Sequence, residues 1–171
     1  FDTWGHEFTL ESRNIVGDFN WKTNLNITIP RNKVVKLSTN NTPIGGDERY
    51  ADWNRLQVGQ PIGVFYGYKT DGLYKDAEDL RNSAKPEGVE IHRTTGAWVG
   101  DVKFKDISGP NGVPDGIINE YDQTVIGDPN PDFTFGFSNT FNYKDWELGI
   151  GLTGSVGADI LNYVRVKTEG V

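Results

Sequence analysis

Residues 133–156 alternate between apolar and polar side chains over two runs of eleven residues, 133–143 and 146–156. The apolar positions on one side are Phe133, Phe135, Phe137, Phe141, Tyr143, Trp146, Leu148, Ile150 and Leu152. Threonine, glycine, serine and asparagine dominate the other side. A period of two is typical of a β-strand whose two faces meet different surroundings. The alternation therefore predicts a hairpin of two long strands.

The first thirty residues repeat this pattern. Apolar side chains alternate with polar ones at Trp4, His6, Phe8 and Leu10, and again over residues 19–29. A polar turn at residues 12–14 is expected to join the two runs. Pro30 is expected to end the second run, because proline cannot donate to a ladder. The chain is thus predicted to be all-β, with antiparallel strands.

The length of these runs bears on the medium that the apolar face touches. Soluble strands usually have about 5–6 residues, whereas a tilted membrane-spanning strand needs about 9–11. Tight turns within each pair and about a hundred residues between the pairs are typical of a transmembrane barrel. A soluble β-sandwich, whose inner faces also alternate, is the alternative. Because barrels begin at about 8 strands, four strands must belong to a larger barrel or be soluble.

Composition excludes several classes of function. The 171 residues include no cysteine, which rules out disulfides, thiolate metal sites and cysteine nucleophiles. No apolar run approaches the ~18 residues of a membrane helix. The net charge of −7 argues against a nucleic-acid partner. The chain has no methionine and opens within a strand, so we expect an internal piece of a longer protein.

The middle of the chain, residues 31–131, is predicted to be a long loop region. A short helix is expected near residues 76–83, with Asp76 as its N-cap and Leu80 facing inward. The segment 106–122 matches a calcium loop in its second half, where Gly116 makes the sharp turn. The expected ligands are Asp106, Ser108, Asp115, Ile117 (through its carbonyl), Asn119 and Asp122. A Gly/Pro turn with scattered carboxylates is the alternative, because about four extra residues interrupt the first half.

Several stretches together resemble one family. They are the pattern from Asn14 to Val34, "VGQPIGVFYGY" (58–68), "DGLY" (71–74), "GDVKFKD" (100–106), "DGIINEYDQTVIGDPNPDFTFGFSNTF" (115–141) and "GSVGADILN" (154–162). Their order and content are similar to those of the SusC/RagA type of TonB-dependent outer-membrane transporters of Bacteroidetes. The block 126–148 carries most of this resemblance.

The resemblance implies the C-terminal part of a 22-stranded barrel in the outer membrane of a Gram-negative bacterium. Residues 1–30 would contribute one strand pair, residues 132–171 a second strand pair and the start of the next loop, and residues 31–131 would be mostly extracellular. The family imports oligosaccharides or peptides, with a SusD-like surface lipoprotein as a lid. Energy comes through TonB and a plug region that these residues do not include. The family's loop is regular where this chain has its insertion within 106–122.

Two other functions are considered. The first is a soluble, secreted β-sandwich that binds glycans, with calcium bracing a loop. The second is an enzyme, which the sequence disfavours: its two histidines, His6 and His92, lie in unrelated contexts, and it has no nucleophile elbow or phosphate loop. We therefore expect no catalytic residues, and the sequence does not identify the residues that touch a ligand.

Overall fold

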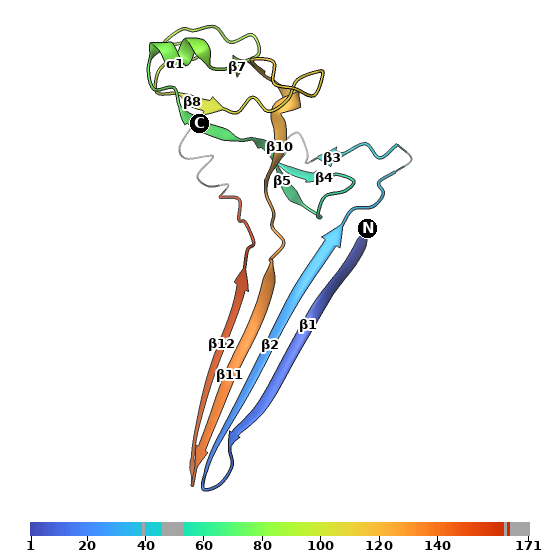
Figure 1. Ribbon diagram of the computed structural model, residues 1–171, viewed down its shortest axis with the longest axis vertical. Coiled ribbons are helices and arrows are strands. Elements are labelled where there is room, and N and C mark those ends of the chain that lie inside the picture. The colour runs from blue at the N-terminus through green and yellow to red at the C-terminus, as the bar shows by residue number, and fades with distance from the viewer. Residues whose placement is uncertain (39, 46–52, 163, 165–171) are drawn as a thin grey trace. The chain divides into compact units, whose positions relative to one another are not determined.

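The computed structural model describes residues 1–38, 40–45, 53–162 and 164 (Figure 1). Within this part the chain is built from β-strands, with one short α-helix and a 3-10 turn. The four long strands pair antiparallel, and two short pairings elsewhere are parallel. The chain divides into two compact units. Unit 1 is Phe1–Gly45, Arg55–Val64 and Gly127–Val171; unit 2 is Gly46–Asn54 and Phe65–Ile126.

Four long strands dominate unit 1: β1 (Asp2–Ile15), β2 (Phe19–Lys33), β11 (Phe133–Tyr143) and β12 (Trp146–Val156). They form one sheet in the order β1-β2-β11-β12, and Figure 1 shows them running side by side. The two hairpins predicted from the alternation are therefore present. The short strands β3 (Ile44–Gly45) and β4 (Asn54–Leu56) pair with each other.

Two predicted strand boundaries are wrong. Residues 12–14 do not form a turn; they lie in β1, which continues to Ile15 with a register shift between Arg13 and Ile15. Pro30 does not end β2, which continues to Lys33 with Gly5 opposite the proline. The pairing of β11 with β2 reaches only as far as Thr28. The side of β2 that would need an amide at Pro30 is thus free of β11, and a proline is tolerated there.

The hairpin of β11 and β12 is closed at both ends. At one end Lys144 adopts φ +52, a conformation that suits a two-residue hairpin turn. At the other end the Asp132 amide donates to the Val156 carbonyl at 2.8 Å. Beyond it, the Asp159 amide donates to the Asp128 carbonyl, and the Asp128 amide donates to the Asp159 carboxylate, both at 2.8 Å. We call this last pair of bonds the aspartate clasp.

Asparagine side chains fix the point where the chain leaves β2 and re-enters β11. The Asn32 amide nitrogen donates to the Asn130 side-chain oxygen at 2.9 Å, and the Ile62 amide donates to Asn32 at 2.7 Å. Asn130 in turn donates to the Ile62 carbonyl at 2.9 Å. Val34 is buried beside this junction and exchanges backbone bonds with Gly59 and Gln60. Three segments that are distant in sequence are therefore held together.

Unit 2 contains most of the remaining elements. They are β5 (Val64–Tyr68), β6 (Thr70–Leu73), α1 (Ala77–Asn82), β7 (Lys85–Pro86), β8 (Val102–Phe104), β9 (Ile117–Ile118), the 3-10 turn η2 (Glu120–Asp122) and β10 (Gln123–Gly127). β6 pairs with β8, β7 with β9, and β5 neighbours β10. The boundary between the units falls within β4, β5 and β10.

The helix α1 is the one predicted near residues 76–83. The Asp76 carboxylate accepts from the amides of Glu78 and Asp79 at 2.9 and 2.8 Å, as an N-cap does. Six residues are too few for a stable isolated helix, so packing must hold it. Leu80, 2% exposed, supplies that packing against Tyr74 and Ala97.

Candidate functional site

The register of the four-stranded sheet gives it two chemically distinct faces. Residues directly opposite one another point to the same face. Leu10, Leu25, Phe137 and Leu152 thus form one row across all four strands. The next row along the strands, on the opposite face, is Glu11, Asn24, Ser138 and Gly151. We call these the apolar face and the polar face.

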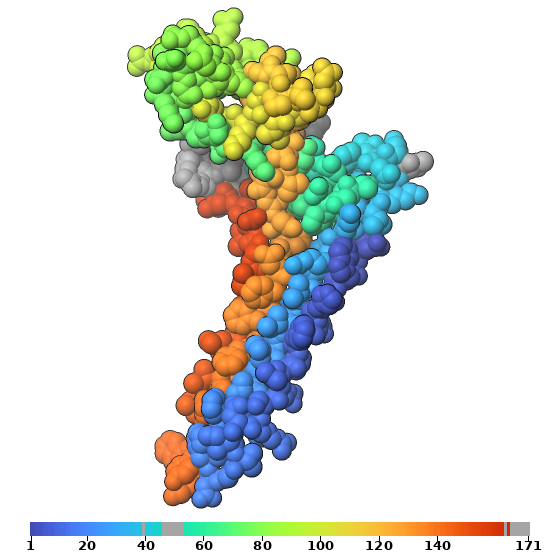
Figure 2. Space-filling model, viewed as in Figure 1, coloured from blue at the N-terminus to red at the C-terminus, as the bar shows by residue number. Residues whose placement is uncertain are grey.

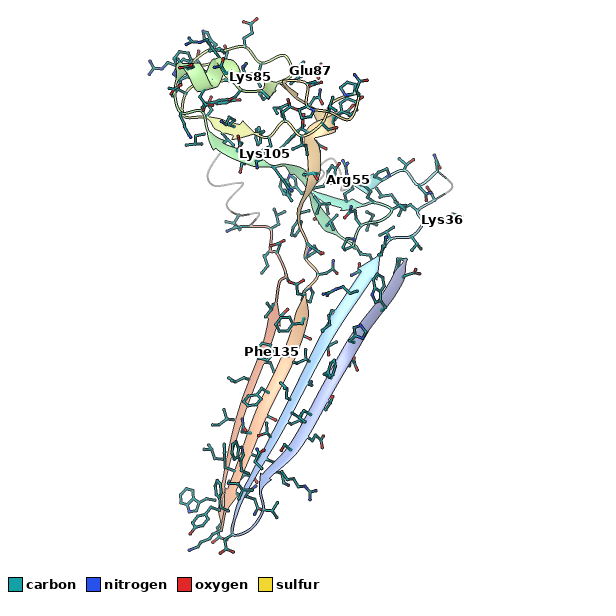
Figure 3. The ribbon with its side chains drawn as sticks, viewed as in Figure 1. Lys36, Arg55, Lys85, Glu87, Lys105 and Phe135 are labelled. Carbon is teal, nitrogen blue, oxygen red and sulfur yellow. The ribbon has the colours of Figure 1, made fainter. Side chains whose placement is uncertain are left out.

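The apolar face is not buried within unit 1. Every residue of the four strands is exposed or half-buried. In β12 the large apolar side chains of Leu148, Ile150 and Leu152 are 57, 47 and 56% exposed. Figure 2 shows this part of unit 1 built from the four strands alone, and Figure 3 shows Phe135 projecting from β11. A largely apolar surface across four strands needs an apolar partner.

Aromatic rings on the apolar face pack over a glycine and against one another. Gly154 has no side chain, and the Phe135 ring of the neighbouring strand lies over it, in the space that a Cβ would need. Trp21 and Phe141 stack at 5.8 Å between ring centroids, and Phe19 and Phe141 at 6.3 Å. These contacts strengthen pairing of strands that have no core beneath them.

Polar side chains interrupt the apolar face in one row, which sequence reasoning missed. The Asn139 side-chain oxygen accepts from the Trp21 indole at 2.8 Å and from the Thr23 hydroxyl at 2.7 Å. Asn14 donates to Thr23 at 2.6 Å, and Ser12 donates to Asn14 at 2.8 Å. We call these five residues the polar network. The available signal was a gap in each alternating run, at positions 23 and 139.

The polar face combines small and hydrophilic side chains. Near the tight turns it is hollowed, and Glu11, Arg13, Lys22, Asn24 and Thr140 are among the residues that line the hollow. Gly149 and Gly151 leave open space where other residues would place a Cβ. Such a surface stays hydrated and offers both charges and hydrogen-bonding groups to water or to a solute.

In unit 2 hydrogen bonds link parts of the segment that carries the predicted calcium ligands. Asp106 accepts from the amides of Gly116 and Asp115 at 2.6 and 3.3 Å. Asp115 accepts from the Ile117 amide at 3.0 Å. These bonds close the loop across its insertion, so the segment 109–114, which contains the extra residues, does not separate Asp106 from Asp115.

Asp122 lies at the centre of this loop and is fully buried. One carboxylate oxygen accepts from the amides of Ile107 and Ser108 at 2.8 and 3.2 Å, and the other from Asn119 at 2.9 Å. Burial alone would raise its pKa, but the hydrogen bonds from Asn119, Ile107 and Ser108 and from the Asp106 side chain lower it overall. Asn119 also caps η2 by accepting from the Tyr121 amide at 3.0 Å.

The donor set fits a hard cation in part. Asp106 and Asp122 are both held by backbone amides of this loop, and carboxylate oxygens are ligands that calcium prefers. Each oxygen that accepts one amide keeps a second lone pair for a metal. Among the described residues, however, no three His, Cys, Asp or Glu side chains converge as a metal-binding group. The carbonyl of Ile117 and the oxygens of Ser108 and Asn119 would have to complete the shell.

Some other titratable groups brace local structure in unit 2. Lys103 donates to Asp79 at 3.0 Å and lies 3.6 Å from Asp71. The Lys75 amide, the Lys103 ammonium and the Ser83 hydroxyl lower the pKa of Asp79 from 3.8 to about 2. His92 accepts from the amides of Thr94 and Thr95 at 3.4 and 3.3 Å and so supports a turn. The described part of the chain contains no helix that is long and apolar enough to cross a membrane.

The chain is similar in sequence to TonB-dependent receptors. TonB-dependent receptor P3 of Formosa agariphila is 35% identical over 174 residues, which cover 95% of this chain and 16% of that protein. TonB-dependent receptor P26 of the same organism is 34% identical over 92% of this chain and 15% of its own length. The chain thus spans about a sixth of the length of these curated relatives. No family model matches the chain.

Proposed function

We propose that this chain is part of a TonB-dependent outer-membrane transporter and that its four-stranded sheet is a segment of the barrel wall. The observation that carries the proposal is the single-layered sheet, which presents a largely apolar face yet buries none of its residues. Lipid would cover that face, and the polar face would line a water-filled lumen. The similarity to TonB-dependent receptors over nearly the whole chain supports the same conclusion.

The strand lengths agree with this role. Eleven residues at about 3.4 Å each, tilted by about 45°, span about 25 Å of depth, which matches the apolar band of an outer-membrane barrel. The sheet's two outer strands would each need a further partner, since unpaired backbone groups in lipid cost several kcal/mol each. A larger barrel of 22 strands would supply those partners.

The finer identity that we propose is the SusC/RagA type of transporter. The protein would import oligosaccharides or peptides, with a SusD-like lipoprotein over its extracellular side and energy supplied through TonB. The whole process is transport without covalent chemistry, so no residue here is assigned a catalytic role. Copurification of the full-length protein with its lipoprotein partner and bound solute would test this identity; isolation without either would contradict it.

The orientation of the two faces can be tested directly in the full-length protein reconstituted into vesicles. This segment contributes no cysteine of its own, so Phe137→Cys and Ser138→Cys can each carry a fluorophore on adjacent residues of opposite faces. Spin-labelled lipid is expected to quench the probe at residue 137 and not the one at 138. Absence of quenching at both positions would overturn the barrel proposal and favour a soluble β-sandwich.

We further propose that calcium braces the loop from Asp106 to Asp122. The two carboxylates of Asp106 and Asp122, both held by amides of this loop, support this assignment, because calcium prefers carboxylate oxygens. Adding calcium to the EGTA-treated full-length protein should slow hydrogen exchange at the amides of residues 107–119, and Asp115→Ala should abolish the difference. Ser83→Ala, outside the loop, is the matched control. Equal exchange with calcium and with EGTA would refute calcium binding.

A further inference from the structure

The polar network of Ser12, Asn14, Trp21, Thr23 and Asn139 lies away from the strand ends, where a lipid-facing surface is expected to be apolar. Asn139 lies four residues from Tyr143 at the end of β11, which corresponds to about 14 Å along the strand and about 10 Å in depth. Apolar rows lie on both sides: Leu25 and Phe137 toward one end, Trp21 and Phe141 toward the other. If the apolar face touches lipid, as proposed above, the network lies inside the hydrocarbon.

A polar side chain at that depth is costly unless its hydrogen bonds are made within the protein. Here they are made between strands: Asn139 of β11 accepts twice from β2, and Asn14 of β1 donates to Thr23 of β2. Three strands are therefore joined by side chains as well as by their backbone ladders. The Trp21 indole, which on a lipid-facing surface would otherwise seek the headgroups, has its partner inside the sheet.

The rest of the apolar face does not specify how the strands align. A slip of two residues between β2 and β11 keeps every side chain on its original face. In the native register Leu25 faces Phe137 and Ile27 faces Phe135. A slip of two residues in one direction would set Leu25 opposite Phe135 and Ile27 opposite Phe133, and a slip in the other direction would set Ile27 opposite Phe137; the one apolar residue of these that would meet a polar partner is Leu25, opposite Asn139. Lipid is indifferent to which apolar residue it touches. The alternating pattern alone thus leaves registers that differ by two residues close in energy.

The polar network removes this ambiguity. A slip of two residues would carry Asn139 opposite Trp21 or Leu25 in place of Thr23. The hydrogen bond from the Thr23 hydroxyl to the Asn139 oxygen would then be lost within the hydrocarbon. One polar position within an apolar interface can fix register in this way in coiled coils. We propose that the polar network is the register lock of β1, β2 and β11 in the membrane, with Asn139 as its positioning residue.

Disulfide cross-linking in the full-length protein tests this lock. On the polar face Asn24 lies directly opposite Ser138, so the pair Asn24→Cys and Ser138→Cys reports the native register. The pairs Lys22→Cys with Ser138→Cys and Asn26→Cys with Ser138→Cys report slips of two residues in either direction. With Asn139 intact, only the native pair should cross-link.

Replacing Asn139 by leucine should reduce the native cross-link severalfold and produce one of the slipped cross-links. Phe137→Leu, on the same face but outside the network, is the matched control and should leave the native pattern unchanged. If Asn139→Leu does not fold, Thr23→Val serves instead, because it keeps the shape of the side chain and removes the bonds to Asn14 and Asn139. Native cross-linking that is unchanged in both variants would overturn the proposal.

A double-mutant cycle provides a second readout. Because Asn139→Leu leaves the Trp21 indole without its acceptor, adding Trp21→Phe should cost less stability than it does alone. Additive losses would contradict the lock. Failure of the lock is distinguishable from failure of the barrel proposal: quenching by spin-labelled lipid would still occur at residue 137 if only the lock is wrong, and would be absent if the sheet is not in a membrane.

Discussion

The four-stranded sheet of unit 1 and the loops of unit 2 differ in where their apolar side chains lie. Unit 2 has short elements but buries Tyr74, Leu80, Ala97 and Ile118, and it turns carboxylates such as Asp122 inward onto backbone amides. The sheet has long, regular strands and buries nothing. Regular secondary structure is therefore no guide to which region carries its own core. Under the proposed barrel role, this difference corresponds to two different surroundings, lipid for the sheet and water for the loops.

The largest effect is expected from a cavity in unit 2. Leu80→Ala removes a side chain that is 2% exposed and should cost about 2–5 kcal/mol of local stability, seen as faster hydrogen exchange in residues 73–104. Leu73→Ala, at a residue that is 52% exposed, should change exchange little. The Leu80→Ala effect should be the same in detergent and in lipid. A dependence on lipid would break the contrast between the two regions.

A charge on the sheet should come next in size. Phe137→Arg places a guanidinium on the apolar face and should cost about 2–4 kcal/mol in the folding of the full-length protein into vesicles. Ser138→Arg, one residue along on the polar face, should cost close to nothing. Urea titrations in the presence of vesicles measure both. Equal costs would show that the two faces do not meet different media.

The smallest expected effect is a loss of stability in acid around α1 of unit 2, caused by protonation of Asp79. Its folded pKa of about 2 lies below the ordinary 3.8, so its ionised form stabilises the fold above about pH 4. This contribution is lost as the pH falls from about 4 to about 2. Hydrogen exchange at α1 should therefore be faster in Asp79→Asn than in wild type at pH 5, and the two should converge near pH 2. A gap that persists at pH 2 would exclude this titration as its origin.

The sequence predicted the long strands well because their pattern is local and repeats many times. It failed at residues 12–14, where polar side chains looked like a turn. Ser12 and Asn14 remain in a strand because Thr23, nine or more residues away, supplies their hydrogen-bonding network, and no local pattern contains that information. The same limit applies to Pro30, whose place in β2 depends on where the pairing with β11 stops.

The candidate calcium loop shows the complementary case. Its motif located the segment, and the structure does bring the ends of its insertion together through Asp106 and Gly116. The sequence did not predict that Asp122 would be fully buried with three amide donors. Burial of that carboxylate depends on the fold of residues 106–109 over it, which the spacing of the motif does not encode.

The aspartate clasp between Asp128 and Asp159 has a mechanical consequence. A hairpin held only by its ladder peels from its open end, one rung at a time, when its two ends are pulled apart. Here tension on the segments flanking β11 and β12 would load the clasp and the Asp132–Val156 bond before it reached the first rung. The hairpin should therefore resist fraying at its open end, because the clasp must break before the ladder can peel.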